Sequence, residues 1–245
     1  MSTKLSIIVA TINRHHHLND CLESIYALPE NVLANIEVIV VDQSKEVYRP
    51  SKQYPRLRIL TCSSGASKAR NTGAQASKGE YLLFFDDDAL LLSLDISFYE
   101  DLVFLEWKER PITLKKFNWL SKKIFFLRKS GAPFFISRRE DYNKVSGFDD
   151  SLGPGRPIYG SEDLDYLLRI LRHAKKIRFN QVGLVSHSVL NSPDKVYMYS
   201  YSRAYVLLKN KEFIYLFILS IVYALSIFIP SRRKSAFGFF AGLLS

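Results

Sequence analysis

Two kinds of hydrophobic pattern alternate along the first part of the chain. One is a short, continuous run of apolar and β-branched residues, which is typical of a strand buried on both faces of a sheet. The other places an apolar residue every three or four positions, which is typical of a helix that packs on a sheet through one face. The alternation predicts an α/β fold with a mostly parallel sheet flanked by helices.

These patterns give the expected boundaries of the elements. We predict strands over Leu5–Ala10, Ile36–Val41, Leu57–Thr61, Tyr81–Phe85, Phe134–Ser137, Ile177–Phe179 and Gly183–His187. We predict helices over Asn19–Leu28, Ser67–Ala76 and Ser161–Ala174. At about residue 190 the sequence becomes Tyr-rich and then apolar, so we divide the chain into an α/β domain at 1–190 and a C-terminal helical segment at 191–245.

The C-terminal segment contains an apolar run with basic residues on both sides. Phe213–Ile229 has 17 residues and no charge, Lys209 and Lys211 precede it, and Arg232–Lys234 follow it. As a helix, at ~1.5 Å per residue, the run would span about 25 Å, less than the ~30 Å hydrocarbon core of a bilayer. Basic flanks on both sides also conflict with the positive-inside preference of a single span. We therefore expect an apolar helical appendage that lies in one membrane leaflet, with a buried core helix as the alternative.

The charge of the chain is unevenly distributed. The chain has 34 Lys and Arg residues against 24 Asp and Glu residues, and residues 108–139 hold ten basic residues and one acid, Glu109. Interleaved aromatic residues make this segment suited to an anionic membrane surface, with a solvated charged face as the alternative. Nothing else in the sequence supports nucleic acid as a partner. Because the first residues carry no signal-peptide pattern, we expect a peripheral or monotopic protein at the cytoplasmic face of the cell membrane.

Acidic residues follow two of the predicted strands. Asp42 ends one of them, and Asp86, Asp87 and Asp88 follow another. In open α/β sheets, ligands bind at the carboxyl ends of the strands. Asp86 and Asp88 point the same way in an extended segment, and Asp87 points elsewhere. Carboxylate oxygens in such an arrangement suit a hard divalent cation, and a solvated acidic loop is the alternative.

Two predicted helices begin with residues that suit a phosphate-containing substrate. Lys68 and Arg70 lie at the start of one helix, where free N–H groups and basic side chains favour an anion. Ordinary capping by Ser67 is the alternative. Glu162 and Asp163 lie at the start of another helix, after a Gly- and Pro-rich stretch, and are well placed to supply a general base. Stabilisation of the helix dipole is the alternative explanation for these two acids.

Five motifs make the pattern recognisable. In chain order they are SIIVATINR, VIVVDQS, SKARNTGAQASKGEYLLFFDDDA, VSGFDD and GSEDLDYLLRI. Together they resemble the family-2 inverting glycosyltransferases of the GT-A fold, of the type that builds bacterial cell-surface polysaccharides. The resemblance covers about residues 4–190. It implies a GT-A domain, a nucleotide-diphosphate-sugar donor, and Mg²⁺ or Mn²⁺ as cofactor.

The resemblance also implies roles for the donor-binding residues. Thr11 and Asp42 would contact the nucleotide base, and Arg70 would approach the base or the diphosphate. Either Asp86 or Asp87 would bind the ribose.

Further roles concern the metal and the chemistry. Asp88, with Asp86 beside it, would bind the metal, and His187 resembles a position that can reach the metal or the diphosphate. A structural role is the alternative for His187. Within the catalytic pair Glu162 and Asp163, Asp163 would be the catalytic base.

The leading functional hypothesis is a metal-dependent transferase, similar to the hexosyltransferases, that moves one sugar from a nucleotide donor to a lipid-linked or surface-glycan acceptor at the membrane. A polyprenyl-phosphate glycosyltransferase and a non-catalytic membrane-bound adaptor of the same fold are the alternatives. A sugar nucleotidyltransferase is disfavoured because no Gly-rich loop follows the first strand. The absence of a QxxRW motif after Asp163 argues against a processive synthase.

Two clusters that could suggest other chemistry do not change this interpretation. The run His15–His17 lacks complementary ligands at a supporting spacing, so we expect it to be exposed in the turn after the first strand. The two cysteines, Cys21 and Cys62, are too few for a disulfide framework or a zinc cluster.

Overall fold

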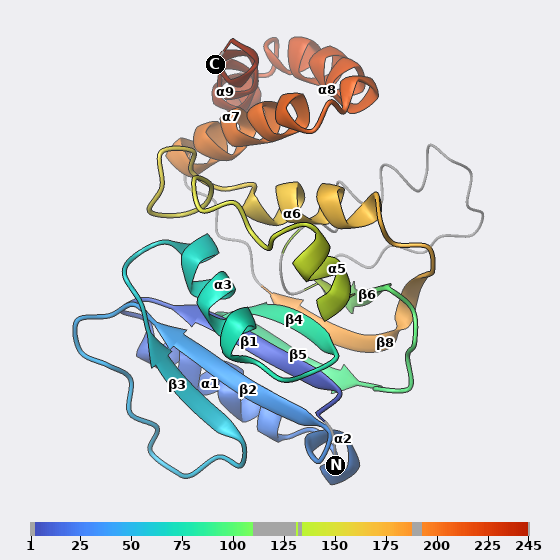
Figure 1. The fold of residues 1–245 in the computed structure, drawn as a ribbon. Helices are drawn as coiled ribbons and strands as arrows, with labels where there is room; N and C mark the ends of the chain where they lie inside the picture. Colours follow the sequence, from blue (N-terminus) through green and yellow to red (C-terminus); the bar gives the residue numbers. More distant parts are fainter. Residues whose placement is uncertain (1–2, 110–130, 132–133, 188–192, 245) are drawn as a thin grey trace.

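The computed structural model describes residues 3–109, 131, 134–187 and 193–244. Most of the basic segment 108–139 therefore lies outside the described residues, and its predicted contact with a membrane surface is not tested. The described residues form one sheet with a layer of helices on each face and a further group of helices at the C-terminus (Figure 1).

The sheet has eight strands among the described residues, in the order β3-β2-β1-β4-β7-β6-β8-β5. Their bounds are β1 Leu5–Thr11, β2 Ile36–Asp42, β3 Leu57–Thr61, β4 Tyr81–Asp86, β5 Ala89–Leu94, β6 Leu102–Trp107, β7 Phe135–Arg138 and β8 Ile177–His187. Strands β3, β2, β1 and β4 are mutually parallel, as are β6 and β8, whereas β7 and β5 run antiparallel to their neighbours. The sheet is thus mixed but mostly parallel.

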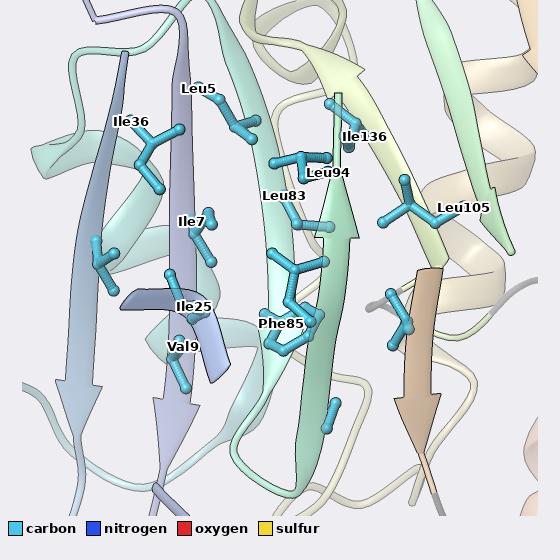
Figure 2. Close-up of a cluster of buried hydrophobic side chains, with 14 of the residues drawn as sticks. Leu5, Ile7, Val9, Ile25, Ile36, Leu83, Phe85, Leu94, Leu105 and Ile136 are labelled. Atoms are coloured by element: carbon cyan, nitrogen blue, oxygen red, sulfur yellow. The ribbon is translucent and has the colours of Figure 1, made fainter. Parts of the chain in front are cut away.

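The central strands are apolar on both faces because helices cover both. Every residue of β2 is buried. On one face, α1 (His15–Tyr26) packs against β1, and Figure 2 shows Leu5, Ile7 and Val9 on the same side as Ile25 of α1. The short helix α2, Glu30–Leu33, follows α1. The end strand β5 also reaches α1, since the Leu91 N–H donates to Ser24 Oγ at 3.0 Å. This contact shows that the sheet curls.

The opposite face of the sheet is covered by α3 (Ala66–Ala76), α5 (Arg139–Lys144) and α6 (Glu162–Leu171) (Figure 1). A second apolar cluster fills this side and includes Phe84 from β4 and Tyr166 from α6. The rings of these two residues lie 5.6 Å apart in an edge-to-face arrangement, which aromatic pairs favour. This packing fixes α6, with Glu162 and Asp163 at its start, over the sheet.

The C-terminal helices pack on α6. They are α7 (Pro193–Lys209), α8 (Phe213–Ser226), the 3₁₀ turn η2 (Pro230–Arg232) and α9 (Arg233–Leu243). Leu164 and Leu168 of α6 belong to the same apolar cluster as Leu207 of α7, Leu216 of α8 and Phe239 of α9. In the described part of the chain no helix is both long enough and apolar enough to cross a bilayer.

Most predicted elements occur within a few residues of their expected positions. Two expectations are wrong. The two strands expected at 177–179 and 183–187 form one strand, β8. The run His15–His17 does not lie in a turn but forms the first turn of α1, and the ring of His15 packs edge-on against Tyr48.

Candidate active site

The predicted acidic residues lie at one edge of the sheet. The parallel register pairs Thr11, the last residue of β1, with Asp42, the last residue of β2. On the other side of β1, Ala10 pairs with Asp86, the last residue of β4. Asp87 and Asp88 form the turn from β4 to β5, and β8 pairs His187 with Ala89 at the start of β5. The sheet therefore brings together residues that are far apart in the chain.

Asp86, Asp88 and His187 form a group that could hold a metal ion. One ligand atom from each lies within 4.8 Å of the other two. His187 Nε2 lies 3.1 Å from Asp88 Oδ1 and 3.8 Å from Asp86 Oδ2. Two carboxylates and one imidazole suit Mn²⁺, and the carboxylates suit Mg²⁺ as well.

Asp87 points away from this group, as the alternation along the chain predicts. Its carboxylate accepts a hydrogen bond from Thr11 Oγ1 at 2.7 Å and pairs with Arg14 at 2.9 Å. Burial raises the pKa of Asp87 to about 6 despite these partners. Arg14 also pairs with Asp88. Arg14 thus links both acids, although sequence reasoning did not identify it as a site residue.

Asp88 and His187 shift each other's protonation. Burial raises the pKa of Asp88, but the hydrogen bonds from His187 and Arg14 outweigh it and hold that pKa below its usual value. Burial lowers the pKa of His187, but Asp88 and Asp86 outweigh it and raise that pKa. An ionised Asp88 is the form that a metal ligand requires.

Arg70 connects the potential metal site, through Asp86, to the start of α6. Its guanidinium lies 3.0 Å from Asp86, 2.8 Å from Glu162 and 3.3 Å from Asp163. Only 6% of the Arg70 side chain is exposed, so these carboxylates replace its water. Burial lowers the pKa of Arg70, but the carboxylates of Asp163 and Glu162 outweigh it and raise that pKa. Arg70 therefore stays charged and holds the two acidic regions together.

Asp42 has a different environment from the other acids. It is fully buried. Its carboxylate accepts hydrogen bonds from the N–H and hydroxyl of Ser44 and from the Tyr48 N–H, and it lies 3.3 Å from His15 Nε2. Burial raises the pKa of Asp42, but these hydrogen bonds outweigh it and lower the pKa. In this structure Asp42 shapes the loop after β2, and its contact with a nucleotide base stays a prediction.

The start of α3 is open rather than capped by a side chain. Gly65 precedes the helix with φ +134°, and Ser67 lies inside the helix and donates to the Leu152 carbonyl, so the alternative of capping by Ser67 is not observed. Lys68 Nζ donates to Ser63 Oγ at 2.7 Å and takes no part in the Arg70 ion pairs. A Cβ on Gly65 would lie 2.6 Å from the guanidinium of Arg156. Only glycine allows Arg156 to lie this close, and sequence reasoning did not identify Arg156.

Among the described side chains of this assembly, negative charge exceeds positive charge. Among the residues that the structure describes, the five acids are Asp86, Asp87, Asp88, Glu162 and Asp163, and the cations paired with them include Arg14, Arg70 and His187. A divalent cation would correct this imbalance, and the two carboxylates and imidazole that lie close together are suitable ligands for it.

Comparison with known proteins identifies the family of the first part of the chain. Residues 6–96 match the family model described as glycosyl transferase family 2. An uncharacterized glycosyltransferase of Haemophilus influenzae is 31% identical over 193 residues, which are 69% of this chain and 62% of that relative. The chain thus spans less than two thirds of the length of this relative.

A second relative links sequence and structure. The poly(ribitol-phosphate) beta-N-acetylglucosaminyltransferase TarS of Staphylococcus aureus is 32% identical over 93 residues, which are 35% of this chain and 16% of TarS. The crystal structure of TarS 1–349 superimposes with a TM-score of 0.57 at 18% identity and covers 84% of this chain and 66% of that one. TarS 1–349 has also been solved in complex with UDP and with UDP-GlcNAc. The sheet and helices described above therefore form a GT-A fold, and the chain belongs to the family-2 glycosyltransferases.

Proposed function

We propose that the protein is a metal-dependent inverting glycosyltransferase that moves one sugar from a nucleotide-diphosphate donor to an acceptor hydroxyl. The ion pairs of Arg70 carry this proposal, because they join Asp86 of the potential metal site to the acidic pair at the start of α6. The group of Asp86, Asp88 and His187 suits a metal-bound diphosphate, and the pair Glu162 and Asp163 suits an acceptor hydroxyl. Since TarS 1–349 binds UDP-GlcNAc, a UDP-sugar is the first donor class to test.

The donor side is built from the ends of β1, β2 and β4. Asp86, Asp88 and His187 would hold Mg²⁺ or Mn²⁺, which when bound neutralises negative charge on the leaving diphosphate. We assign the ribose to Asp86 or Asp87 and the base to Thr11 and Asp42. Lys68 and Arg70, at the start of α3, add positive charge on the diphosphate side.

Asp163 is the residue we propose as the base. Its side chain is 18% exposed, whereas that of Glu162 is 7% exposed and accepts a hydrogen bond from Arg70. Asp163 is therefore the more accessible of the pair to an acceptor hydroxyl. Arg70 lies 3.3 Å from Asp163 Oδ1. The carboxylate would take the acceptor proton as the hydroxyl attacks opposite the leaving diphosphate, and one such displacement inverts the anomeric centre.

We propose a lipid-linked or surface-glycan acceptor at the cytoplasmic face of the membrane, in the synthesis of a cell-surface polysaccharide. Support comes from TarS, whose name describes a poly(ribitol-phosphate) acceptor, and from the apolar C-terminal helices. A polyprenyl phosphate as the acceptor, and an adaptor with no activity, are the alternatives that the following test addresses.

The Asp163→Asn variant tests the proposed function. We expect transfer to fall about a hundredfold or more, because general-base catalysis contributes roughly 10²–10⁴ in rate, while UDP binding is retained. Release of nucleotide from UDP-, GDP- and dTDP-sugars, with Mn²⁺ and with candidate acceptors, measures the activity. Asp20→Asn, which removes an exposed acid of α1, is the control. If the unmodified protein binds no nucleoside diphosphate in the presence of Mn²⁺ or Mg²⁺, the adaptor hypothesis is correct.

A further inference from the structure

Helix α8 has an inner face that packs on its own protein. Tyr215, Leu216 and Ser226 are buried on this face, and Tyr215 and Leu216 join the apolar cluster shared with α6, α7 and α9. Figure 1 shows α7 between α6 and the pair α8 and α9. The inner face of α8 therefore accounts for only part of its apolar sequence.

The outer face of α8 and the segment that follows it are also apolar. The side chains of Phe217, Leu225 and Phe228 are 69%, 64% and 81% exposed. Further exposed apolar residues are Phe213, Ile214, Ile221, Val222 and Ile229. No charged residue occurs from Phe213 to Pro230. A helix whose outer face meets water carries polar residues there, and a continuous exposed apolar surface marks a docking site.

The charges around this outer face indicate what covers it. Lys211 and the half-buried Glu212 precede α8, Arg232 and Arg233 follow it, and the three cations are exposed. Cations at both ends of an apolar helix match a layer that is apolar inside and anionic at its surface, which describes a bilayer with anionic headgroups. A protein partner would need an apolar groove with acidic residues at both ends.

The length of α8 determines its orientation. Its 14 residues span ~21 Å at ~1.5 Å per residue, less than the ~30 Å of a hydrocarbon core. A helix crossing the core could not place both flanking cations at one surface, whereas a helix lying along the surface could.

We propose that the outer face of α8 docks along the surface of an anionic phospholipid bilayer, with Lys211 and Arg232 against the headgroups. The bilayer would be the membrane partner of the transferase, so the biological role of this docking rests on the proposed function. Binding to vesicles, however, requires neither donor nor acceptor, so it is measured independently of transfer.

Polar contacts join this docking layer to the candidate active site. The Ser161 and Ser202 hydroxyls lie 2.9 Å apart, between the start of α6 and α7. At the C-terminal end of α7, Asn210 and Lys209 contact the buried Asp165 of α6 at 2.8 and 2.9 Å. Docking through α8 would therefore set the position of Asp163 relative to the lipid surface.

The test measures co-sedimentation of the full chain with vesicles of phosphatidylcholine and phosphatidylglycerol. The triple variant Phe217→Gln, Leu225→Gln and Phe228→Gln replaces exposed side chains and should bind at least about tenfold more weakly, because three apolar side chains no longer enter the bilayer. The variant Lys211→Gln with Arg232→Gln should bind phosphatidylcholine vesicles as the unmodified protein does, but should lose the preference for phosphatidylglycerol. Tyr99→Gln, which changes an apolar ring that is 59% exposed on the catalytic domain, should bind as the unmodified protein does.

Two results would overturn the proposal. One is vesicle binding by the triple variant equal to that of the unmodified protein. The other is an unmodified protein that is dimeric in solution and does not bind vesicles, together with a triple variant that is monomeric. A second copy of the chain would then cover α8. Circular dichroism and UDP binding show whether the triple variant is still folded. Phe228→Gln alone is a milder change for the case in which the triple variant does not fold. A triple variant that no longer binds vesicles but still binds UDP supports docking. An unmodified protein that binds vesicles but not UDP contradicts only the proposed sugar transfer.

Discussion

At the scale of single residues, Asp87 and Asp88 are neighbours in the chain whose surroundings differ although they share Arg14. Asp88 faces His187, whereas Asp87 faces Thr11, and Arg14 pairs with both. The pKa of Asp88 is held below its usual value, while burial raises that of Asp87 to about 6. The two acids should therefore differ in their effect on metal binding.

We predict that Asp88→Asn weakens the binding of Mn²⁺ by about tenfold or more, since a carboxylate ligand is lost. Asp87→Asn is the matched control and should change Mn²⁺ affinity by less than about threefold, because its carboxylate lies outside the group of potential ligands. Isothermal titration with Mn²⁺ in the absence of donor measures both. An equal loss of Mn²⁺ affinity in the two variants would contradict the proposed role of Asp88 as a metal ligand.

The sequence predicts some of these residues better than others. Asp86 and Asp88 could be placed on one side because the strand period of two extends past the end of β4. The positions of Arg14 and Arg156 could not be predicted, since both lie in irregular segments where no period indicates direction. Their contacts with Asp87 and with Gly65 depend on loops from different parts of the chain.

At the scale of elements, α7 holds the turn that leads into α6. Gly160 has φ +88°, and a Cβ there would lie 2.6 Å from the ring of Tyr199 on α7. Ser161 also has a positive φ, +58°, and its hydroxyl lies 2.9 Å from that of Ser202. The position of Asp163 thus depends on a close approach between a glycine and a helix of the C-terminal group.

We predict that Gly160→Val lowers kcat by about tenfold or more, because even a small displacement of a base is costly, and changes UDP affinity by less than about threefold. The added Tyr199→Ala substitution should restore part of kcat by making room for the new side chain. Steady-state kinetics with the preferred donor, together with UDP titration, measures the two quantities. Because a valine at φ +88° stays strained in both variants, Tyr199→Ala alone is the control, and an unchanged kcat in that variant together with no recovery in the double variant would contradict a role of the α7 contact in positioning Asp163.

The elements themselves differ in how well their sequence predicts them. The buried strands β1, β2 and β4 and helix α3 stand out because their apolar residues are continuous or periodic. Strand β5 directly follows three acids and strand β6 leads into the basic segment, so neither was expected. The polar residues at 180–181 divide the apolar sequence of β8, where the pairing with β6 also shifts in register. Contacts between strands, rather than local pattern, determine these elements.

At the scale of the whole molecule, Asp149 ties the α/β domain to the C-terminal helices. Its carboxylate accepts a hydrogen bond from Lys209 of α7 at 2.6 Å. Burial raises the pKa of Asp149, but the hydrogen bonds from Lys209 and Ser151 outweigh it and lower the pKa to about 2. A carboxyl with a lowered pKa in the folded protein stabilises it above the unfolded pKa of ~3.9, and that contribution is lost as the pH falls toward the folded pKa.

We predict that Asp149→Asn lowers the Tm at pH 6 by about 2–4 °C, corresponding to about 1 kcal/mol for a partly exposed pair. The difference from the unmodified protein should shrink between pH 4 and pH 2. Asp194→Asn, which breaks an exposed pair with Lys234, should shift the Tm by less than about 1 °C. Thermal unfolding across this pH range measures each, and a difference that persists at pH 2 would exclude the Asp149 charge as its cause.

The wide separation in sequence of the candidate site residues has a consequence for how the protein can be divided. His187 meets Asp88 across 99 positions, and Arg70 meets Glu162 across 92. During synthesis, a nascent chain that stops before β8 has neither the imidazole nor the strand that places it. Closing such long loops is entropically costly and slows assembly. If these residues act as proposed, we expect that residues 6–96, which match the family model, do not serve as a minimal enzyme, and that fragments ending within α6 are inert even when their strands pair correctly.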